Sequence, residues 1–369
     1  MTDDRQDEPG EVRRALAQVT RVVLKVGSRS LLEEGRFEEL AAAIAGQRAA
    51  GRQVVLVSSG AIALGVARLG MSGRPRQLPE LQAAAAAGQA ALMRRYEEAF
   101  EPHGVAPAQV LLTHSDLADR ERWSNARQAI DALLELGAVP IVNENDTVAV
   151  EEIRFGDNDQ LAAMVSTLVG ADLLVLLTDV DGVLDQDGVV IETVRGGDGL
   201  AHLFRKAKDE VGRGGIESKV RSARRATLRG VPAVIGNAGD PAFLDELLSG
   251  RPVGTLFLPA GVRLPSRKHW IAYALEPKGA LLVDDGAVRA LKGEASLLAA
   301  GIDGVRGDFE PGDCVRLHGP NGEEIGRGLV RFATADVARL AGAHSDQVEQ
   351  RLGRRATGIV MHRDDMVMV

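Results

Sequence analysis

Two lysines stand beside glycines in segments that are suited to phosphate binding. Lys25 and Gly27 close the apolar run Val22–Leu24, and Lys219 follows the glycine-containing stretch 212–215. A lysine at the end of a buried strand costs free energy unless an anion or a carboxylate meets it. We therefore predict that Lys25 contacts a phosphate, with the alternative that its side chain extends from the strand edge into water.

A strand-to-helix segment with two serines and a glycine offers a second position for an anion. Ser58, Ser59 and Gly60 follow the apolar run Val54–Val57, and a helical pattern begins near Ala61. Free N–H groups at a helix N-terminus attract carboxylates and phosphates, and glycine allows a ligand to approach the backbone. A serine that caps the helix without binding any ligand is the alternative.

The densest group of polar residues falls in two adjoining segments. Asn143–Asp146 follow the apolar run Val139–Val142, and Gly156–Asp159 precede a helical pattern that begins at Gln160. So many Asn and Asp side chains suit the recognition of an ammonium group and the orientation of lysines or of Mg²⁺. Their spacing lacks the pattern of an EF-hand calcium loop. Ordinary turns stabilised by Asn and Asp remain the alternative.

A fourth candidate site combines a strand end with a glycine-rich segment. Thr178 and Asp179 follow the run Leu173–Leu177, and residues 212–219 lead into a helix that we expect to begin at Glu217. Glycines ahead of a helix with a lysine in its first turn can hold a nucleotide phosphate through backbone N–H groups and one point charge. The segment predicts a nucleotide site, although it contains neither a Walker A loop nor a Rossmann glycine fingerprint.

The elements that must position these residues alternate between short apolar strands and longer helices. This alternation predicts an α/β fold, with a doubly wound and mostly parallel sheet flanked by helices. The predicted strands, each apolar enough for burial on both faces, are Val22–Val26, Val54–Val57, Gln109–Leu112, Val139–Val142, Leu173–Leu177 and Val231–Ile235. The clearest predicted helices are Phe37–Ala50, Leu81–Phe100, Asn125–Leu136, Gln160–Leu168 and Glu217–Arg229. Ligands gather at the carboxyl ends of strands in such sheets, so the polar residues above are expected to meet there.

A second domain is expected after the α/β domain. The proline-containing stretch 259–277 is followed by short strands separated by turn signals at Asp285-Gly286, Glu310-Pro311-Gly312 and Pro320-Asn321-Gly322. This pattern is typical of a small, mostly β barrel. We expect residues 1–260 to form the α/β domain, 261–275 a linker and 276–369 the β domain.

The composition indicates which partners and which cellular compartment to expect. The 369 residues carry a formal net charge of -8, which argues against a protein built to wrap nucleic acid. The single cysteine, Cys314, rules out an internal disulfide and fits a reducing compartment, so a cytoplasmic location is expected. No run of residues has the length and apolar character of a membrane span.

Taken in order, the motifs resemble the amino acid kinase family, and most closely its glutamate-phosphorylating members with a C-terminal PUA domain. The resemblance covers nearly the whole chain, with residues 1–260 as the amino acid kinase domain and 276–369 as the PUA-like domain. The matching segments are Leu24–Ser28, Val57–Ile62, Asp119–Ala126, Asn143–Asp146, Gly156–Asp159, Leu177–Asp179 and Gly214–Gly215 with Lys219.

The resemblance implies a role for each matching residue. The implied catalytic residues are Lys25, Lys219 and Asp159, of which Asp159 orients the two lysines. The implied glutamate-binding residues are Ser59, Asp146 and Asn158. The implied ATP-binding residues are Lys25, Thr178, Asp179, Arg213, Gly214, Gly215, Ile216, Glu217, Ser218 and Lys219. The chain departs from the family pattern at Arg29, where a smaller residue is usual, and at Ile216-Glu217-Ser218, where Glu217 brings a negative charge toward the phosphates.

The implied activity is that of a phosphotransferase with a carboxyl group as acceptor. ATP and Mg²⁺ are used to phosphorylate the γ-carboxylate of L-glutamate, the first step of proline biosynthesis. The resemblance also implies a homo-oligomer, proline as feedback inhibitor and a glutamate-5-semialdehyde dehydrogenase as the recipient of the labile product. A carboxylate with a reference pKa of about 4.3 is already ionised at neutral pH, so this nucleophile requires no general base.

Two other functions remain open from the sequence. A related kinase acting on acetylglutamate, aspartate or carbamate would share the same fold. An RNA-binding PUA protein is disfavoured, because residues 276–369 hold twelve Lys and Arg against fifteen Asp and Glu, with Phe309 and Phe332 as the only aromatic residues.

Overall fold

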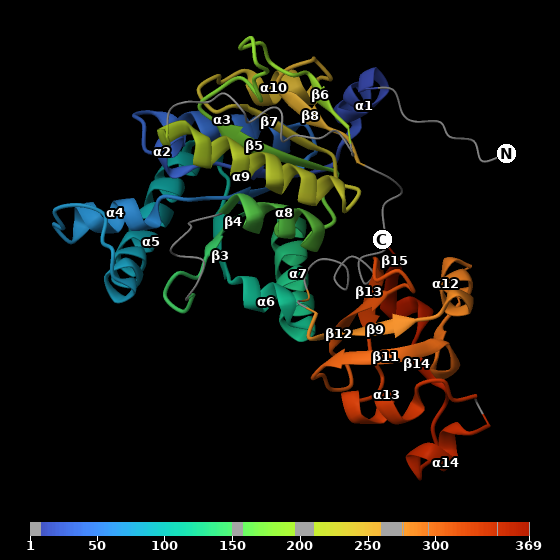
Figure 1. Cartoon of the computed structure of the whole chain (residues 1–369). Helices are drawn as coiled ribbons and strands as arrows, with labels where there is room; N and C mark the ends of the chain where they lie inside the picture. The colour runs from blue at the N-terminus through green and yellow to red at the C-terminus, as the bar shows by residue number, and fades with distance from the viewer. Residues whose placement is uncertain are drawn as a thin grey trace. The chain divides into compact units, whose positions relative to one another are not determined.

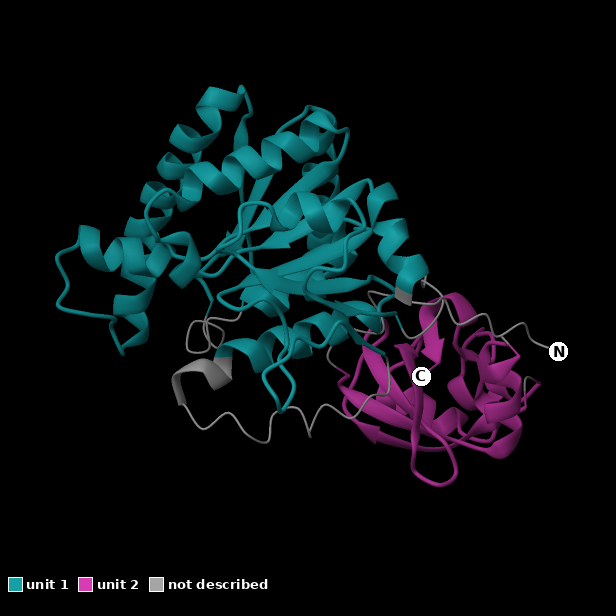
Figure 2. Cartoon of the chain, turned by 90° about the horizontal axis from the view of Figure 1, so that it is seen from above, with its two compact units in different colours: residues 1–263 teal, residues 264–369 magenta. Residues whose placement is uncertain are grey.

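The chain divides into two units, residues 1–263 and residues 264–369 (Figure 2). The structure, a computed structural model, describes residues 9–149, 158–195, 210–259, 275, 277–293, 295–344 and 346–368. The expected linker over 261–275 lies outside these residues except for Leu275, and so do Gly156 and Asp157 of the second Asn- and Asp-rich segment.

An eight-stranded sheet forms the centre of the first unit (Figure 1). The strand order is β3-β4-β2-β1-β5-β7-β8-β6, and all neighbours are parallel except β7 and β8. The strands are β1 (Arg21–Lys25), β2 (Gln53–Val57), β3 (Pro107–Leu112), β4 (Val139–Glu144), β5 (Leu173–Thr178), β6 (Thr193–Val194), β7 (Ala233–Asn237) and β8 (Thr255–Phe257). The predicted α/β fold with a mostly parallel sheet is confirmed.

Helices cover both faces of this sheet (Figure 1). Apolar residues of α3, α5 and α10 pack on one face in a single core with Leu24 and Val22 of β1, whereas α8 and α9 contact β1, β5 and β7. The helices of this unit are α1 (Pro9–Ala15), α2 (Ser28–Leu31), α3 (Arg36–Ala49), α4 (Ala61–Arg68), α5 (Leu78–Phe100), α6 (His114–Ala118), α7 (Arg120–Glu135), α8 (Asn158–Leu168), α9 (Glu210–Thr227) and α10 (Phe243–Leu248). No helix within the described ranges is both long enough and apolar enough to cross a bilayer.

The expectation that every strand is buried on both faces is wrong for β3. Five of its six residues are at least partly accessible, whereas all six residues of β4 are buried. The reason is position, because β3 pairs only with β4 and forms an edge of the sheet. Pairing between strands distant in sequence is not visible in the local apolar pattern.

Helices α4 and α5 pack with their backbones in direct contact. A Cβ atom on Gly88 would lie 1.7 Å from the carbonyl oxygen of Ala61, and one on Gly65 would lie 1.7 Å from that of Ala84. Only glycine fits at these two positions, since neither backbone can retreat without separating the helices. The alanine-rich run within α5 is therefore part of a tightly packed helix.

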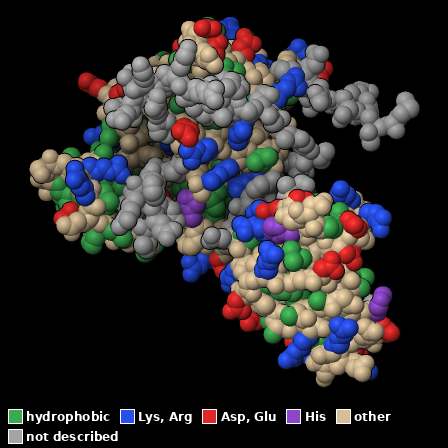
Figure 3. Space-filling model, viewed as in Figure 1, with side chains coloured by type: hydrophobic (Ala, Val, Ile, Leu, Met, Phe, Trp, Pro, Cys, Tyr) green, Lys and Arg blue, Asp and Glu red, His purple; other side chains and the backbone are tan. Residues whose placement is uncertain are grey.

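The second unit has a mostly β core of its own. A five-stranded sheet, in the order β11-β9-β12-β13-β15, is accompanied by the pair β10 and β14. Its elements are β9 (Gly279–Val283), α12 (Asp285–Lys292), β10 (Leu297–Leu298), β11 (Ile302–Gly307), β12 (Cys314–His318), β13 (Glu324–Leu329), α13 (Thr334–Leu340), α14 (Val348–Leu352), β14 (Ile359–Met361) and β15 (Met366–Met368). On the face shown in Figure 3, basic and acidic side chains of this unit are interspersed.

Candidate active site

The predicted site residues gather at the carboxyl ends of four neighbouring strands. In sheet order these are β4 with Asn143, β2 with Ser58 and Ser59 just beyond it, β1 with Lys25, and β5 with Thr178. Parallel strands place these ends along one edge of the sheet, which is where doubly wound folds bind ligands. Asn158 and Asp159 reach the same edge from the start of α8.

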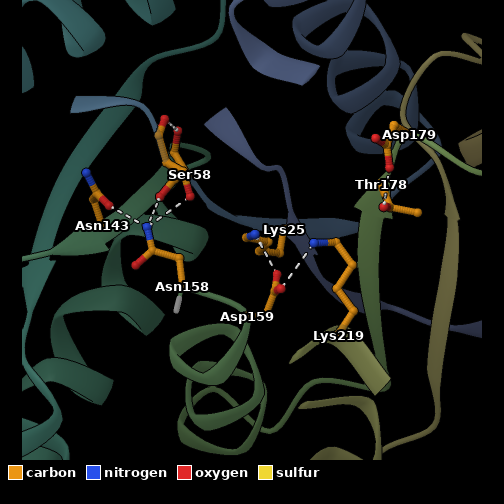
Figure 4. A network of polar contacts seen from close by, with 9 residues as sticks. Lys25, Ser58, Asn143, Asn158, Asp159, Thr178, Asp179 and Lys219 are labelled. Atoms are coloured by element: carbon orange, nitrogen blue, oxygen red, sulfur yellow. Dashed lines mark hydrogen bonds and ion pairs between the residues drawn. The ribbon is translucent and has the colours of Figure 1, made fainter. Parts of the chain in front are cut away.

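One carboxylate joins the two lysines (Figure 4). Oδ1 of Asp159 lies 2.5 Å from Nζ of Lys25, and Oδ2 accepts a hydrogen bond of 3.1 Å from Nζ of Lys219. Only 5% of Lys25, 4% of Asp159 and 8% of Lys219 is exposed. Two positive charges and one negative leave the cluster with a net positive charge in a place from which water is largely excluded, which suits the binding of an anion.

The lysines determine the ionisation of Asp159. Burial alone would raise the pKa of this carboxyl group, but the charges of Lys25 and Lys219 and their hydrogen bonds outweigh burial and lower the pKa below its ordinary value. Asp159 is therefore ionised at neutral pH. It holds both ammonium groups in place and compensates part of their charge while no anion is bound.

Beside this ion cluster lies a network of neutral polar groups (Figure 4). Nδ2 of Asn158 is within hydrogen-bond distance of the carbonyl oxygen of Ser58 at 2.8 Å, Oγ of Ser59 at 3.0 Å and Oδ1 of Asn143 at 2.9 Å. These acceptors turn the amide nitrogen toward the ends of β2 and β4. The other side of the carboxamide, with its oxygen, faces away from Ser58 and Asn143.

The turn after β4 contains a carboxyl group that titrates near neutral pH. The pKa of Asp146 is raised to about 7, chiefly because burial disfavours the charged form, with a further increase from the charge of Glu144 and an opposing effect of Arg74. Glu144, the last residue of β4, is buried, with Oε1 3.5 Å from Nδ1 of His114. A bound cation would stabilise the ionised form of Asp146, so this turn favours a ligand with a positively charged group.

Thr178 is the last residue of β5, and Asp179 follows it. Oγ1 of Thr178 donates a hydrogen bond of 3.1 Å to Oδ1 of Asp179, while Oδ2 lies 3.4 Å from Nη1 of Arg29. Burial would raise the pKa of Asp179, but hydrogen bonds and the charges of Arg29 and Lys219 lower it. The unusual Arg29 therefore links helix α2, which follows β1, to the end of β5, in an ion pair whose two side chains are largely exposed.

The expectation that a helix begins at Glu217 is wrong. Helix α9 includes Glu210, so the glycines at 212, 214 and 215 lie inside the helix and do not form a loop ahead of it. Lys219 is consequently beyond the first turn. Each glycine in a helix lowers its stability by only about 1 kcal/mol relative to alanine. The burial of Val220, Ala223 and Ala226 and the bond between Lys219 and Asp159 offset this loss.

The residues predicted to bind ATP through this segment therefore lie along a helix. Arg213 and Gly214 belong to α9, and the structure describes side chains from Gly215 onward. Ile216 and Ser218 are partly exposed, and Glu217 forms an ion pair with Arg221 one turn further on. The negative charge of Glu217 is thus paired within the helix.

Sequence reasoning missed several residues that hold the network. Gln89 and Tyr96 of α5 bond to Asn143 and Ser58, although neither belongs to a polar motif. Their spacing is the one available signal, because residues seven apart share a helix face, and polar side chains that are buried or half-buried on such a face need partners.

Comparison with known proteins gives the same division into two parts. A model of the amino acid kinase family matches residues 20–237, and a model of the PUA domain matches residues 279–352. The chain is 45% identical over 374 residues to the glutamate 5-kinase of Pelobacter propionicus, with 97% of this chain and 100% of that protein covered. It is 46% identical over 363 residues to the glutamate 5-kinase of Thermus thermophilus, with 94% and 97% covered.

A solved structure is similar at a lower level. Carbamate kinase from Giardia lamblia bound to AMP-PNP superposes with a TM-score of 0.48 at 16% identity, covering 66% of this chain and 99% of that chain.

Proposed function

Because the chain belongs to the amino acid kinase family, we propose that it transfers the γ-phosphoryl group of ATP to the side-chain carboxylate of glutamate. The products are ADP and γ-glutamyl 5-phosphate, and the reaction is the first step of proline biosynthesis. The observation that supports this most directly is the pair of buried lysines held by Asp159 beside a network of oriented amides.

The lysines act on the charge that the phosphoryl group carries during transfer. An oxygen of the glutamate carboxylate forms the new bond to phosphorus while the bond from phosphorus to the β,γ-bridging oxygen breaks, and no proton moves. In such a reaction catalysis consists of positioning and charge stabilisation. Lys25 and Lys219 neutralise the oxygens of the transferring group and reduce its repulsion of the incoming carboxylate, while Asp159 keeps both ammonium groups in place.

The acceptor is held on the β2 and β4 side of the site. Asn158 and Ser59 orient glutamate by hydrogen bonds, and Asp146 pairs with its α-ammonium group. The raised pKa of Asp146 supports this assignment, because a carboxyl group near neutrality gains its charge when an ammonium group approaches. Neutral amides next to an anionic acceptor avoid adding further negative charge.

ATP is held on the β5 and α9 side. Thr178, Asp179 and the residues of α9 from Arg213 to Lys219 surround the nucleotide, with Lys25 and Lys219 at its phosphates. Mg²⁺ neutralises phosphate charge when it is bound, and it prefers ATP phosphates, water and one or two carboxylates over an all-protein cage. The described residues contain no group of three or more His, Cys, Asp or Glu side chains arranged to hold a metal.

A trapping assay tests the reaction. The purified protein with ATP, Mg²⁺, glutamate and hydroxylamine is expected to yield γ-glutamyl hydroxamate, because hydroxylamine attacks acyl phosphates. Acetylglutamate, aspartate and carbamate serve as matched alternative acceptors. Turnover of any of them at a rate equal to that of glutamate would overturn the choice of substrate while leaving the phosphoryl chemistry intact.

The proposal also covers the cellular location, the regulation and the partners of the enzyme. The lone and buried Cys314 supports a cytoplasmic enzyme. Feedback inhibition by proline, assembly into a homo-oligomer and delivery of the labile product to glutamate-5-semialdehyde dehydrogenase are carried over from the family resemblance. The interspersed charges of the second unit favour a role other than RNA binding.

A further inference from the structure

Helix α5 contacts the acceptor side of the site at Gly88, Gln89 and Tyr96, among other residues. Gly88 touches the first residue of α4, Gln89 bonds to Asn143 of β4, and Tyr96 bonds to Ser58 after β2. Gln89 and Tyr96 are seven residues apart, which places them two turns apart on the same side of the helix. One rigid helix therefore reaches both strand ends that carry the amide network.

The Tyr96 hydroxyl has a single described partner, and that partner belongs to the network. Its oxygen lies 2.7 Å from Oγ of Ser58, and both residues are 0% exposed. The ring packs edge-on against Phe37 at 4.9 Å between centroids. Burial raises the pKa of Tyr96 far above its ordinary value, although the bond to Ser58 opposes this, so the phenol stays neutral and acts through its hydrogen bond.

Ser58 passes this constraint to the amide network. Its side chain is held by Tyr96, while its backbone carbonyl accepts the bond of 2.8 Å from Nδ2 of Asn158. A shift of the Ser58 peptide would move an acceptor of Asn158 and also the adjoining Ser59, whose hydroxyl lies 3.0 Å from the same nitrogen. Tyr96 thus fixes the peptide between Ser58 and Ser59. Both residues supply an oxygen that lies within hydrogen-bond distance of Asn158.

Gln89 fixes the second strand end in a similar way. Oδ1 of Asn143 accepts from the backbone N–H of Glu144 at 2.9 Å, and this donor determines which end of the carboxamide is the oxygen. Nδ2 of Asn143 then donates to Oε1 of Gln89 at 2.9 Å, while its Oδ1 also accepts from Asn158. Gln89 therefore supports the orientation in which Asn143 can hold Asn158.

The contact at Gly88 keeps α5 in register with these bonds. A side chain there would collide with the carbonyl oxygen of Ala61, which begins α4 directly after the Ser58–Gly60 turn. The helix is thus fixed against the same turn whose serine it hydrogen-bonds. These contacts are neutral, and the Tyr96–Ser58 bond among them is fully buried. Contacts of this kind set geometry without altering the charge of the site.

We propose that Tyr96 and Gln89 are positioning residues for the acceptor, which hold Asn158 in its substrate-binding orientation through Ser58 and Asn143. This rests on the proposed function, in which Asn158 and Ser59 bind glutamate. Neither Tyr96 nor Gln89 touches the substrate, and the ATP side of the site does not depend on them.

Tyr96→Phe tests the proposal because it removes only the hydroxyl. The glutamate KM is expected to rise about three- to tenfold, the factor that corresponds to one net hydrogen bond, while the ATP KM changes by less than about twofold. Phe37→Leu is the matched control, since it disturbs the same aromatic contact and lowers the melting temperature without touching the hydrogen bond. It should leave the glutamate KM unchanged.

A double-mutant cycle with Ser58→Ala adds a second readout. If Tyr96 acts through Ser58, the Tyr96→Phe/Ser58→Ala protein should have the glutamate KM of Ser58→Ala alone. A Tyr96→Phe protein with a lowered melting temperature but unchanged KM values would reduce Tyr96 to a stabilising role and overturn the proposal. Equal rises in both KM values, or additive effects in the cycle, would overturn it as well.

Hydroxamate formation by the wild-type protein tests the proposed function independently of the role of Tyr96 and Gln89. Absence of hydroxamate formation with glutamate would refute the substrate assignment by itself. The variants are compared on whichever acceptor the wild-type protein phosphorylates, so the dependence of acceptor KM on Tyr96 is decided in either case.

Discussion

Replacing Asp159 with asparagine keeps the shape of the side chain and removes the charge that holds the two lysines. The carboxylate lies 2.5 and 3.1 Å from the two Nζ atoms, and all three residues are buried. Loss of one partner from a buried ion pair costs about 3–5 kcal/mol, because the remaining charge is left uncompensated. At about 1.4 kcal/mol per factor of ten, we expect kcat to fall by roughly 10² to 4 × 10³ if this cost appears in the transition state.

The same substitution has an opposite effect on nucleotide binding. Asp159 repels the phosphates as well as holding the lysines, so Asp159→Asn leaves the site more positive toward ATP. The ATP KM is expected to stay the same or to fall while kcat collapses. Steady-state kinetics of hydroxamate formation measure both parameters. A variant with kcat within about fivefold of the wild type, or with a raised ATP KM, would show that Asp159 does not position the lysines.

Stability measurements give an independent check with a defined pH dependence. The pKa of Asp159 is lower in the folded protein than its ordinary value near 3.9. The ion pairs therefore stabilise the fold at pH values above about 4, and their contribution is lost as pH falls through the lower folded pKa. The difference in unfolding free energy between wild type and Asp159→Asn should be constant between about pH 6 and 8 and should shrink below about pH 4. A difference that grows in acid would contradict the ion pairing.

The remaining predictions concern other parts of the site and the second unit. Lys25→Ala and Lys219→Ala should each lower kcat by roughly 10³-fold with little change in melting temperature, because each removes a cation that stabilises the transferring group; a loss below about tenfold would refute that role. The pKa of Asp146 of about 7 predicts that the glutamate KM falls about tenfold from pH 6 to 8, as the carboxylate forms, and that Asp146→Asn abolishes this dependence. Arg29→Ser should raise the ATP KM about three- to tenfold at low salt, less at high salt, because a largely exposed arginine can exchange its carboxylate partner for a phosphate; an unchanged ATP KM would leave Arg29 without a role. A chain ending at Leu275 should fold and retain activity, since the described catalytic residues and their core lie in the first unit; a folded but inactive protein would place an essential element beyond that point.

The local chemistry of the strand ends was predictable, whereas the order of the strands was not. Lys25 and Asn143 follow apolar runs, and that alone places them at carboxyl ends. The sheet brings them close because β1 and β4 flank β2, an arrangement set by pairing between strands far apart in sequence. The expectation that β3 is buried on both faces was wrong for the same reason. Its composition resembles that of a central strand, but its pairing with β4 alone is not visible in its own sequence.

Helices α9 and α5 show two features that the sequence of a single segment does not reveal: where a helix begins, and which distant residue a side chain contacts. Three glycines favour a loop at 212–215, but tertiary packing of the following residues and the Lys219–Asp159 bond stabilise a helix that continues through them. In α5 the helix itself is predictable, yet Tyr96 finds its partner 38 residues away. No periodicity in a single segment specifies such a pair.

The arrangement of charge across the site suggests why its two halves are built differently. On the α8 and α9 face, three ionised groups meet, which is tolerable in a buried place because Asp159 partly compensates Lys25 and Lys219 until phosphates arrive. On the α5 face the contacts to Ser58 and Asn143 are neutral. In the proposed reaction an anionic acceptor must approach an anionic phosphoryl group, and oriented amides bind that acceptor without adding repulsion beside the reacting carboxylate. Asp146, whose pKa is raised to about 7 by burial and by the charge of Glu144, is a carboxyl group on this side whose charge can follow that of the ligand.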